Sequence, residues 1–204
     1  MAELKPNGVA GVVLGAYGIA LQSGLTTGLA NQDTLFSLQW APVNDSRNPL
    51  MVITKFALRA QIVTPFTAAQ EIRASAFIAR AYTAPDTGGT AVTLTGNNLK
   101  RRASSGTTLV ADLRIATTAS NTPGTRITDG NPFLRILGAQ VQAAASAVAP
   151  LIEGKFEVLN PQTYPIVLAN QEGIVGINEL AFGAAGTVRF GVDIEWLEVL
   201  PLPC

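Results

Sequence analysis

Apolar and polar residues alternate without a break over residues 187–196, near the C-terminal end of the chain. Arg189, Asp193 and Glu195 fall on one face of this segment. The apolar side chains fall on the other face and are Val188, Phe190, Val192, Ile194 and Trp196. A period of two is typical of a half-buried strand in an antiparallel sheet. The pattern therefore predicts a sheet with one face in the core and one face outside it.

Strand patterns separated by turn-forming residues recur along the chain from residue 34 onward. The predicted strands are 34–40, 51–63, 72–82, 91–94, 109–116, 133–141, 155–159, 165–169, 173–181 and 187–199. The last four are joined by short connections, which favour antiparallel neighbours. We find no long amphipathic helix, no strand and helix alternation and no fixed repeat. We expect an all-β fold, an antiparallel two-sheet β-sandwich of jelly-roll type, with a barrel as the alternative.

The first 30 residues form a different kind of segment, rich in glycine and small residues. Its glycines weaken a regular helix or strand and are Gly8, Gly11, Gly15, Gly18, Gly24 and Gly28. We interpret residues 1–30 as an extended arm and residues 31–204 as the sandwich domain. Such an arm gains order by lying on a neighbour, so residues 1–25 should be removable without unfolding the sandwich. The expected partner-binding residues are Val9, Val12, Val13, Leu14, Ile19 and Leu21.

The low charge of the chain bears on its surroundings. Charged residues make up 14% of the sequence, compared with roughly 25% in a typical soluble domain. Much of the surface must therefore be neutral, which indicates oligomerisation or assembly. The 14 basic and 14 acidic side chains cancel, so no overall field attracts nucleic acid or an anionic membrane. We expect neither as a partner, and no apolar run reaches the roughly 18 residues that span a bilayer.

The chain contains no histidine and a single cysteine, Cys204. It therefore lacks the commonest general base, the usual partner of a nucleophilic serine and the commonest zinc ligand. Asp86-Thr87-Gly88 matches the short signature of aspartic proteases, but it occurs once, follows Pro85 and has the composition of an ordinary turn. We expect no enzyme activity, no cofactor and no metal.

Two further groups of charged residues are candidates for chemistry. Carboxylates near the end of the chain offer a pair for glycoside hydrolysis, although a solvent-facing strand gives the same alternation. They are Glu153, Glu157, Asp193, Glu195 and Glu198. Lys100-Arg101-Arg102 is the one dense basic cluster; it suits a phosphate contact, a solvated loop or an ion pair with a neighbouring subunit. Trp40 and Trp196 end alternating strands and are predicted to be core residues.

Several short phrases between residues 50 and 199 resemble a recurrent type of tailed-bacteriophage virion protein. They are FTAAQE at 66–71, ARAYT at 79–83, DTGGTA at 86–91, TLTGNN at 93–98, YPIVLANQEG at 164–173 and GAAGTVR at 183–189. The resemblance implies a capsid decoration (cement) protein or another minor virion component. It further implies the major capsid protein as partner, a homo-oligomer with a trimer favoured, and a place on the capsid surface after synthesis in the host cytoplasm.

Together these observations predict a non-enzymatic virion protein that binds the capsid exterior as a homo-oligomer and stabilises the shell. The alternative is a tail-appendage or receptor-binding module that recognises the host through loops 83–91, 96–108 and 119–132. A third hypothesis is a glycan-active enzyme that uses the carboxylates named above. Copy number in the particle separates the first two, because a decoration protein is present in far more copies than a tail component.

Overall fold

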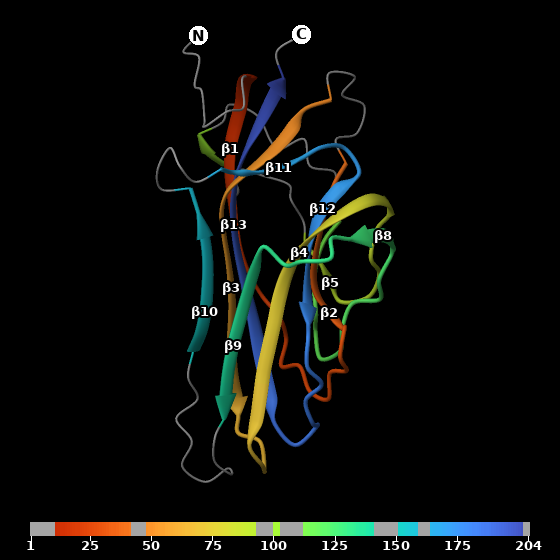
Figure 1. Ribbon diagram of the computed structural model, residues 1–204, viewed down its shortest axis with the longest axis vertical. Helices are drawn as coiled ribbons and strands as arrows, with labels where there is room; N and C mark the ends of the chain where they lie inside the picture. The colour runs from red at the N-terminus through yellow and green to blue at the C-terminus, as the bar shows by residue number, and fades with distance from the viewer. Residues whose placement is uncertain are drawn as a thin grey trace.

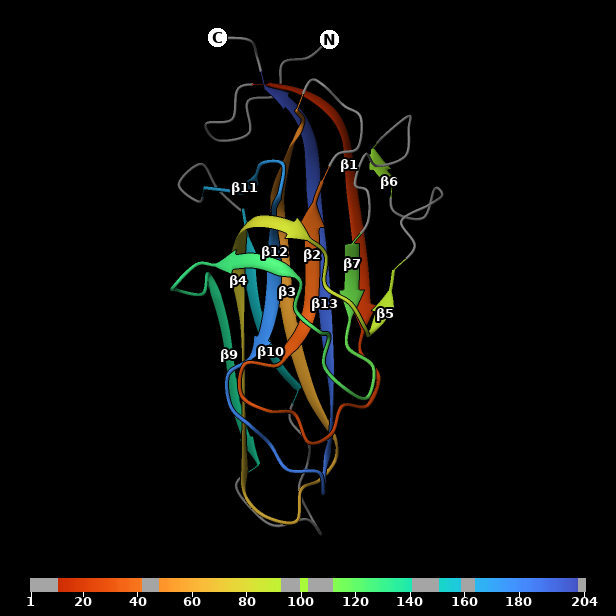
Figure 2. The same cartoon turned by 90° about the vertical axis from the view of Figure 1, so that its right-hand side faces the viewer.

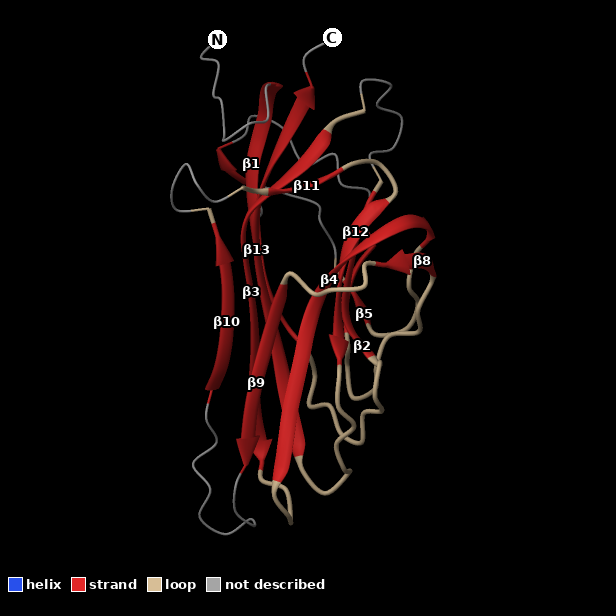
Figure 3. Cartoon of the chain, in the orientation of Figure 1, coloured by secondary structure: helices blue, strands red, loops and turns tan. Residues whose placement is uncertain are grey.

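The computed structural model describes residues 11–41, 48–92, 100–102, 112–140, 151–158 and 164–201. Its strands are β1 (Gly11–Gln22), β2 (Thr34–Trp40), β3 (Leu50–Thr64), β4 (Gln70–Ala84), β5 (Thr90–Ala91), β6 (Lys100–Arg102), β7 (Asp112–Ile115), β8 (Thr125–Thr128), β9 (Leu134–Gln140), β10 (Leu151–Glu157), β11 (Ile166–Leu168), β12 (Glu172–Asn178) and β13 (Thr187–Pro201). Within these residues there is no helix (Figure 3). The all-β prediction is confirmed.

The strands form two antiparallel sheets that pack face to face. Sheet A has the order β10-β3-β13-β1-β6, and β11 pairs with β3 beyond β10. Sheet B has the order β5-β7-β2-β12-β4-β8, and β9 pairs with β4. Figure 1 shows β10, β3, β13 and β1 of sheet A on the left and β12, β2 and β5 of sheet B on the right, with β4 and β9 of sheet B between them; in Figure 2 sheet B faces the viewer. The predicted two-sheet sandwich is confirmed, and no ladder joins the sheets within the described residues.

The core lies between the sheets and follows the alternation of the long strands. In β13, burial alternates residue by residue from Val188 to Trp196, and the five apolar side chains of this stretch are all buried. Trp40 is 0% exposed and Trp196 is 1% exposed, so both are core residues as predicted. The ring of Trp196 stacks on that of Tyr17, with centroids 5.6 Å apart. Aromatic stacking of this kind adds to the stabilisation from burial.

Residues 11–22, assigned to the arm from sequence, form strand β1 inside sheet A. β1 pairs with β13 from Gly11 opposite Pro201 to Gln22 opposite Gly191, and it lies between β13 and β6. Glycine did not prevent a strand here. At Gly11 the neighbouring strand packs so closely that a Cβ would overlap the Val199 side chain and the Leu200 carbonyl oxygen. The inward side chain of Tyr17 is 1% exposed. Deleting residues 1–25 would remove it and uncover β13, so we now expect that deletion to unfold the sandwich.

Side chains close one edge of the sandwich, where β9 of sheet B runs beside β10 of sheet A (Figure 1). Two glycines make this approach close enough. Gly138 lies against the Ile152 side chain, and a Cβ at Gly154 would come within 2.8 Å of the Ile136 Cγ2 atom. The inward positions of β10 are half-buried and its outward positions are exposed. This edge is therefore held by interlocking apolar contacts.

Part of the outer face of sheet B lies under a covering layer, formed by the end of β4 that bends across the sheet, by β8, which pairs with that end, and by the loops beside them (Figure 2). Beneath it lies a small second cluster of apolar residues, separate from the main core, consisting of Ala79, Tyr82, Val175 and Ile177. The outer face of sheet A has no such cover in the described part of the chain. In the part of the chain that the structure describes, the two faces therefore differ, and sheet A presents the broader strand surface.

Candidate functional site

The outer face of sheet A carries rows of polar side chains that cross four strands. One row runs from Glu153 on β10 through Arg59 on β3 and Gly191 on β13 to Gln22 on β1. Strand register fixes this arrangement, because residues directly opposite in an antiparallel pair point to the same face. The neighbouring row places Asp193 beside Ala20.

Arg59 connects the acidic side chains of this face. Its guanidinium lies 2.6 Å from Asp193 Oδ2 and 2.7 Å from Glu153 Oε1. The hydrogen bond from Arg59 holds the pKa of the Glu153 carboxyl below its usual range. Lys155 lies 3.6 Å from Glu153, and Lys55 lies 3.6 Å from Glu195 on β13. Arginine suits this bridging position because its planar fork can donate to two carboxylates at once.

The carboxylates proposed for glycoside hydrolysis do not form one group. Asp193, Glu195 and Glu153 lie on the outer face and take part in the ion pairs just described. Glu157 is on the same face of the β10 edge strand, opposite Lys55. Glu198 is buried and accepts a hydrogen bond from Trp196 Nε1 at 3.3 Å. The sheet therefore separates Glu198 from the other carboxylates, and Arg59 occupies the space between Glu153 and Asp193.

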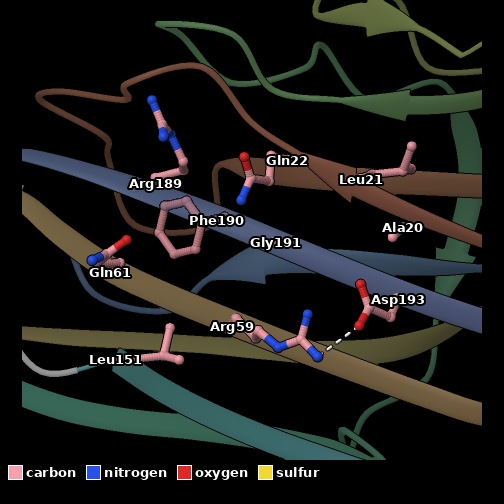
Figure 4. Close-up of a pocket in the computed structure, with 10 residues that line it drawn as sticks. All are labelled: Ala20, Leu21, Gln22, Arg59, Gln61, Leu151, Arg189, Phe190, Gly191 and Asp193. Carbon is pink, nitrogen blue, oxygen red and sulfur yellow. Dashed lines mark ion pairs between the residues drawn. The ribbon is translucent and has the colours of Figure 1, made fainter.

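A hollow of about 390 Å³ opens on this face (Figure 4). Its lining residues are Ala20, Leu21, Gln22, Arg59, Gln61, Leu151, Arg189, Phe190, Gly191 and Asp193. The hollow exists because Gly191 contributes no side chain in the middle of β13. The Arg189 side chain lies beyond Gly191 on the same strand, and its Nε atom is buried without a hydrogen-bond partner. The lining offers hydrogen-bond donors on the Arg189 guanidinium and on the Gln22 and Gln61 amides.

A buried polar cluster lies under the cover of sheet B and contains the aspartate of Asp86-Thr87-Gly88. Asp86 is 0% exposed and accepts hydrogen bonds from the Tyr82 hydroxyl at 2.7 Å, from the Gly124 backbone N–H at 2.8 Å and from the Arg126 guanidinium. Arg126 also donates to Thr34 Oγ1 at 3.0 Å. Burial and the hydrogen bond to Asp86 raise the pKa of the Tyr82 hydroxyl. The carboxylate is thus paired with an arginine, unlike the shared carboxylate pair of an aspartic protease.

Sequence reasoning missed the role of this cluster. It placed Asp86 at a loop tip and Arg126 in a long loop, whereas the structure joins these two loops by a bridge between Thr87 and Thr122. The available signal was weak and consisted of one acidic residue in the first loop and one arginine in the second. The cluster holds the covering layer onto sheet B, which is a structural role.

The six residues predicted to bind a partner fall into three groups. Val9 lies outside the described residues. Val12 is 44% exposed, and Val13 and Leu14 are half-buried beside it, at the end of the sandwich where β1 begins and β13 ends (Figure 1). Ile19 and Leu21 are half-buried and pack against the core of their own chain. Of the five predicted residues that the structure describes, those at the beginning of β1 are therefore the ones that contribute outward-facing apolar surface.

The basic cluster Lys100–Arg102 forms the short strand β6, which pairs with β1. Its side chains lie outside the described residues, as do most of loop 96–108 and the alanine-rich residues 142–149. In the part of the chain that the structure describes, no three acidic or cysteine side chains are grouped as metal ligands. No helix long and apolar enough to cross a membrane occurs among those residues.

Comparison of the chain with protein-family models, with curated proteins and with solved structures gives no match. The fold itself defines the class of this protein: an antiparallel two-sheet β-sandwich in which, among the described residues, the outer face of sheet B is partly covered and that of sheet A is open.

Proposed function

We propose that this protein is a non-enzymatic structural component of a phage virion. It binds the capsid exterior as a homo-oligomer, with a trimer favoured, and stabilises the shell through contacts with the major capsid protein. The chain is made in the host cytoplasm and works on the particle surface. The observation that carries the proposal is strand β1, which has no charged side chain in its 12 residues although it lies on the open sheet.

The surface of β1 suits close contact with another protein. Its outward positions in the middle of the strand are the small residues Ala16, Gly18 and Ala20. At its beginning, the exposed Val12 lies opposite Leu200 of β13. Covering such a surface removes apolar area from water without removing charges from it, so the desolvation cost is low. Small residues also allow a partner to approach the backbone closely.

Stabilisation of the shell then follows from mass action. A protein that binds the assembled shell and not its separated subunits raises the stability of the assembled state, by an amount that grows with its concentration relative to its dissociation constant. Low surface charge agrees with this role, since 14% charged residues are few for a protein that faces water on all sides.

The test is binding of the purified chain to particles that lack it, measured by co-sedimentation. Val12→Glu adds a charge to the β1 surface and is expected to abolish binding. The matched control is Ile127→Glu, because Ile127 on β8 is also an exposed apolar residue, at 67%, but lies on sheet B. Normal binding of Val12→Glu, with both variants folded, contradicts the proposed docking surface.

The second candidate is a tail-appendage or receptor-binding module. The exposed Ile127 favours it, because this residue lies in the covering layer of sheet B together with loops 83–91 and 119–132. Recognition residues are often placed on loops held by a rigid scaffold. In this case Ile127→Glu would abolish binding to host cells, whereas Val12→Glu would leave it intact. The same two variants therefore distinguish the two functions.

A further inference from the structure

The geometry points to the hollow around Gly191 as a binding site for a carboxylate side chain of a partner protein, with Arg189 as its charged donor. The first observation is charge balance. The lining of the hollow holds two basic side chains, Arg59 and Arg189, and one carboxylate, Asp193. Arg59 pairs with Asp193 and also with Glu153 beside the hollow. Among the described residues, Arg189 is thus the basic side chain of the lining that has no acidic partner.

The second observation is the hydrogen bonding of Arg189. Its Nε atom is buried, yet it has no hydrogen-bond partner. A buried donor without a partner costs free energy, so a rotation of the Arg189 side chain that brings its guanidinium to an incoming acceptor removes that cost. Gln61, directly opposite Arg189 on β3, and Gln22 also line the hollow, on either side of Phe190 (Figure 4).

The chemistry favours a carboxylate over other ligands. A guanidinium binds the two oxygens of a carboxylate with two parallel hydrogen bonds. One unpaired positive charge matches a monoanion. A sugar is disfavoured, because the one aromatic residue of the lining, Phe190, is 1% exposed and belongs to the core. The exposed Leu151 at the rim supplies an apolar contact for a protein surface around the acidic side chain.

The assignment to a partner subunit rests on the proposed function, since the hollow lies on the same open face as β1. An aspartate or glutamate from a protein lying across this face would enter the hollow and pair with Arg189. The carboxylate-binding chemistry itself does not depend on that function, so it is tested first and separately.

The test is an NMR titration of the full-length, ¹⁵N-labelled protein with sodium acetate, at constant ionic strength maintained with sodium chloride. We expect saturable shifts of the Gly191 backbone amide and of the Gln22 and Gln61 side-chain amides. Arg189→Gln should abolish the saturable shifts. The matched control, Arg135→Gln on sheet B, should leave them unchanged.

A second variant fills the hollow and leaves the fold intact. A Cβ at Gly191 would lie 3.6 Å from the Leu21 carbonyl oxygen and 3.7 Å from Arg59 Cβ, which is ordinary van der Waals contact. Gly191→Ala should therefore fold normally and bind acetate more weakly. The carboxylate assignment is overturned if wild-type shifts do not saturate, if Arg189→Gln retains them, or if inorganic phosphate saturates the site at lower concentration than acetate.

The partner assignment has its own readout, the co-sedimentation of Arg189→Gln with particles. Weakened binding supports an acidic side chain of the shell as the ligand. Normal binding of Arg189→Gln overturns the shell as the source of the carboxylate while leaving the proposed function in place. If wild-type protein binds acetate but no particles, the proposed function fails and the hollow remains a carboxylate site.

Discussion

Replacing Asp86 with asparagine tests the buried cluster that fastens the covering layer to sheet B. The substitution keeps the size of the side chain and removes its charge. Arg126, whose side chain is 6% exposed, is then left as a buried cation without a counter-charge. The Tyr82 hydroxyl and the Gly124 backbone N–H can still donate to the asparagine carbonyl oxygen, so the loss comes mainly from the arginine.

Removing one partner of a buried ion pair costs about 3–5 kcal/mol. Because two of the hydrogen bonds to residue 86 survive, we expect the lower end, about 3 kcal/mol. Typical domains have unfolding free energies of about 5–15 kcal/mol, so the variant should remain folded but lose a large share of its stability. With a urea dependence of about 3 kcal/mol per molar, the unfolding midpoint should fall by about 1 M.

The assay is urea unfolding followed by tryptophan fluorescence, for Asp86→Asn, Arg126→Met and the double variant. The double variant should lose less than the sum of the single losses, because both charges are then absent. Asp193→Asn is the matched control: its pair with Arg59 is partly exposed, so the expected loss is less than about 1 kcal/mol. A loss below about 1 kcal/mol for Asp86→Asn would refute the reasoning.

Three further predictions follow from local geometry. Gly124→Ala places a Cβ against two backbone carbonyl oxygens and should lower the free energy of unfolding by more than about 2 kcal/mol. Gly130→Ala, where a Cβ meets nothing within 4 Å, should change it by no more than about 0.5 kcal/mol. Equal urea midpoints for the two variants would contradict this prediction. The raised pKa of Tyr82 favours its neutral form, so its contribution to stability is complete below about pH 10 and declines as the pH rises further. The urea midpoint of unfolding should therefore fall between pH 9 and pH 11 more steeply in wild type than in Tyr82→Phe. An equally steep fall in both proteins would show that ionisation of Tyr82 is not responsible. Arg59→Gln should raise the pKa of Glu153 toward its ordinary value in an NMR titration of the side-chain carboxyl; an unchanged pKa would show that Arg59 is not what lowers it.

The sequence was sufficient to predict the sandwich, because its long strands bury one face and leave the other outside the core. The alternation in residues 187–196 predicted β13 and its inward residues. The same pattern predicted β3 within two residues of its bounds. A period of two is a local property of the chain and can be recognised without knowing the neighbouring strands.

Strand β1 was missed because glycine was counted against a strand. Glycine does weaken an isolated strand, but here the neighbouring backbone of β13 leaves no room for a side chain at Gly11. Whether such a glycine lies in a loop or in a crowded sheet depends on the partner strand, which is about 180 residues away in the chain. Tertiary contacts of this kind are not visible in a local pattern.

The candidate site depends even more on distant pairing. The hollow forms because β3 and β13 pair in a register that places Arg59 opposite Gly191. The buried ion pair joins Asp86 and Arg126 across 40 residues. The carboxylates could be identified in the sequence, but their partners could not, since register decides which side chains meet.

The most direct test of the central claim, that this protein works as a structural component of the virion surface, is its copy number in purified particles. Quantitative mass spectrometry of the particles, normalised to the major capsid protein, measures it. The account predicts hundreds of copies in each particle. A few to a few dozen copies would instead favour the tail-appendage function, and absence of the protein from purified particles would contradict the claim.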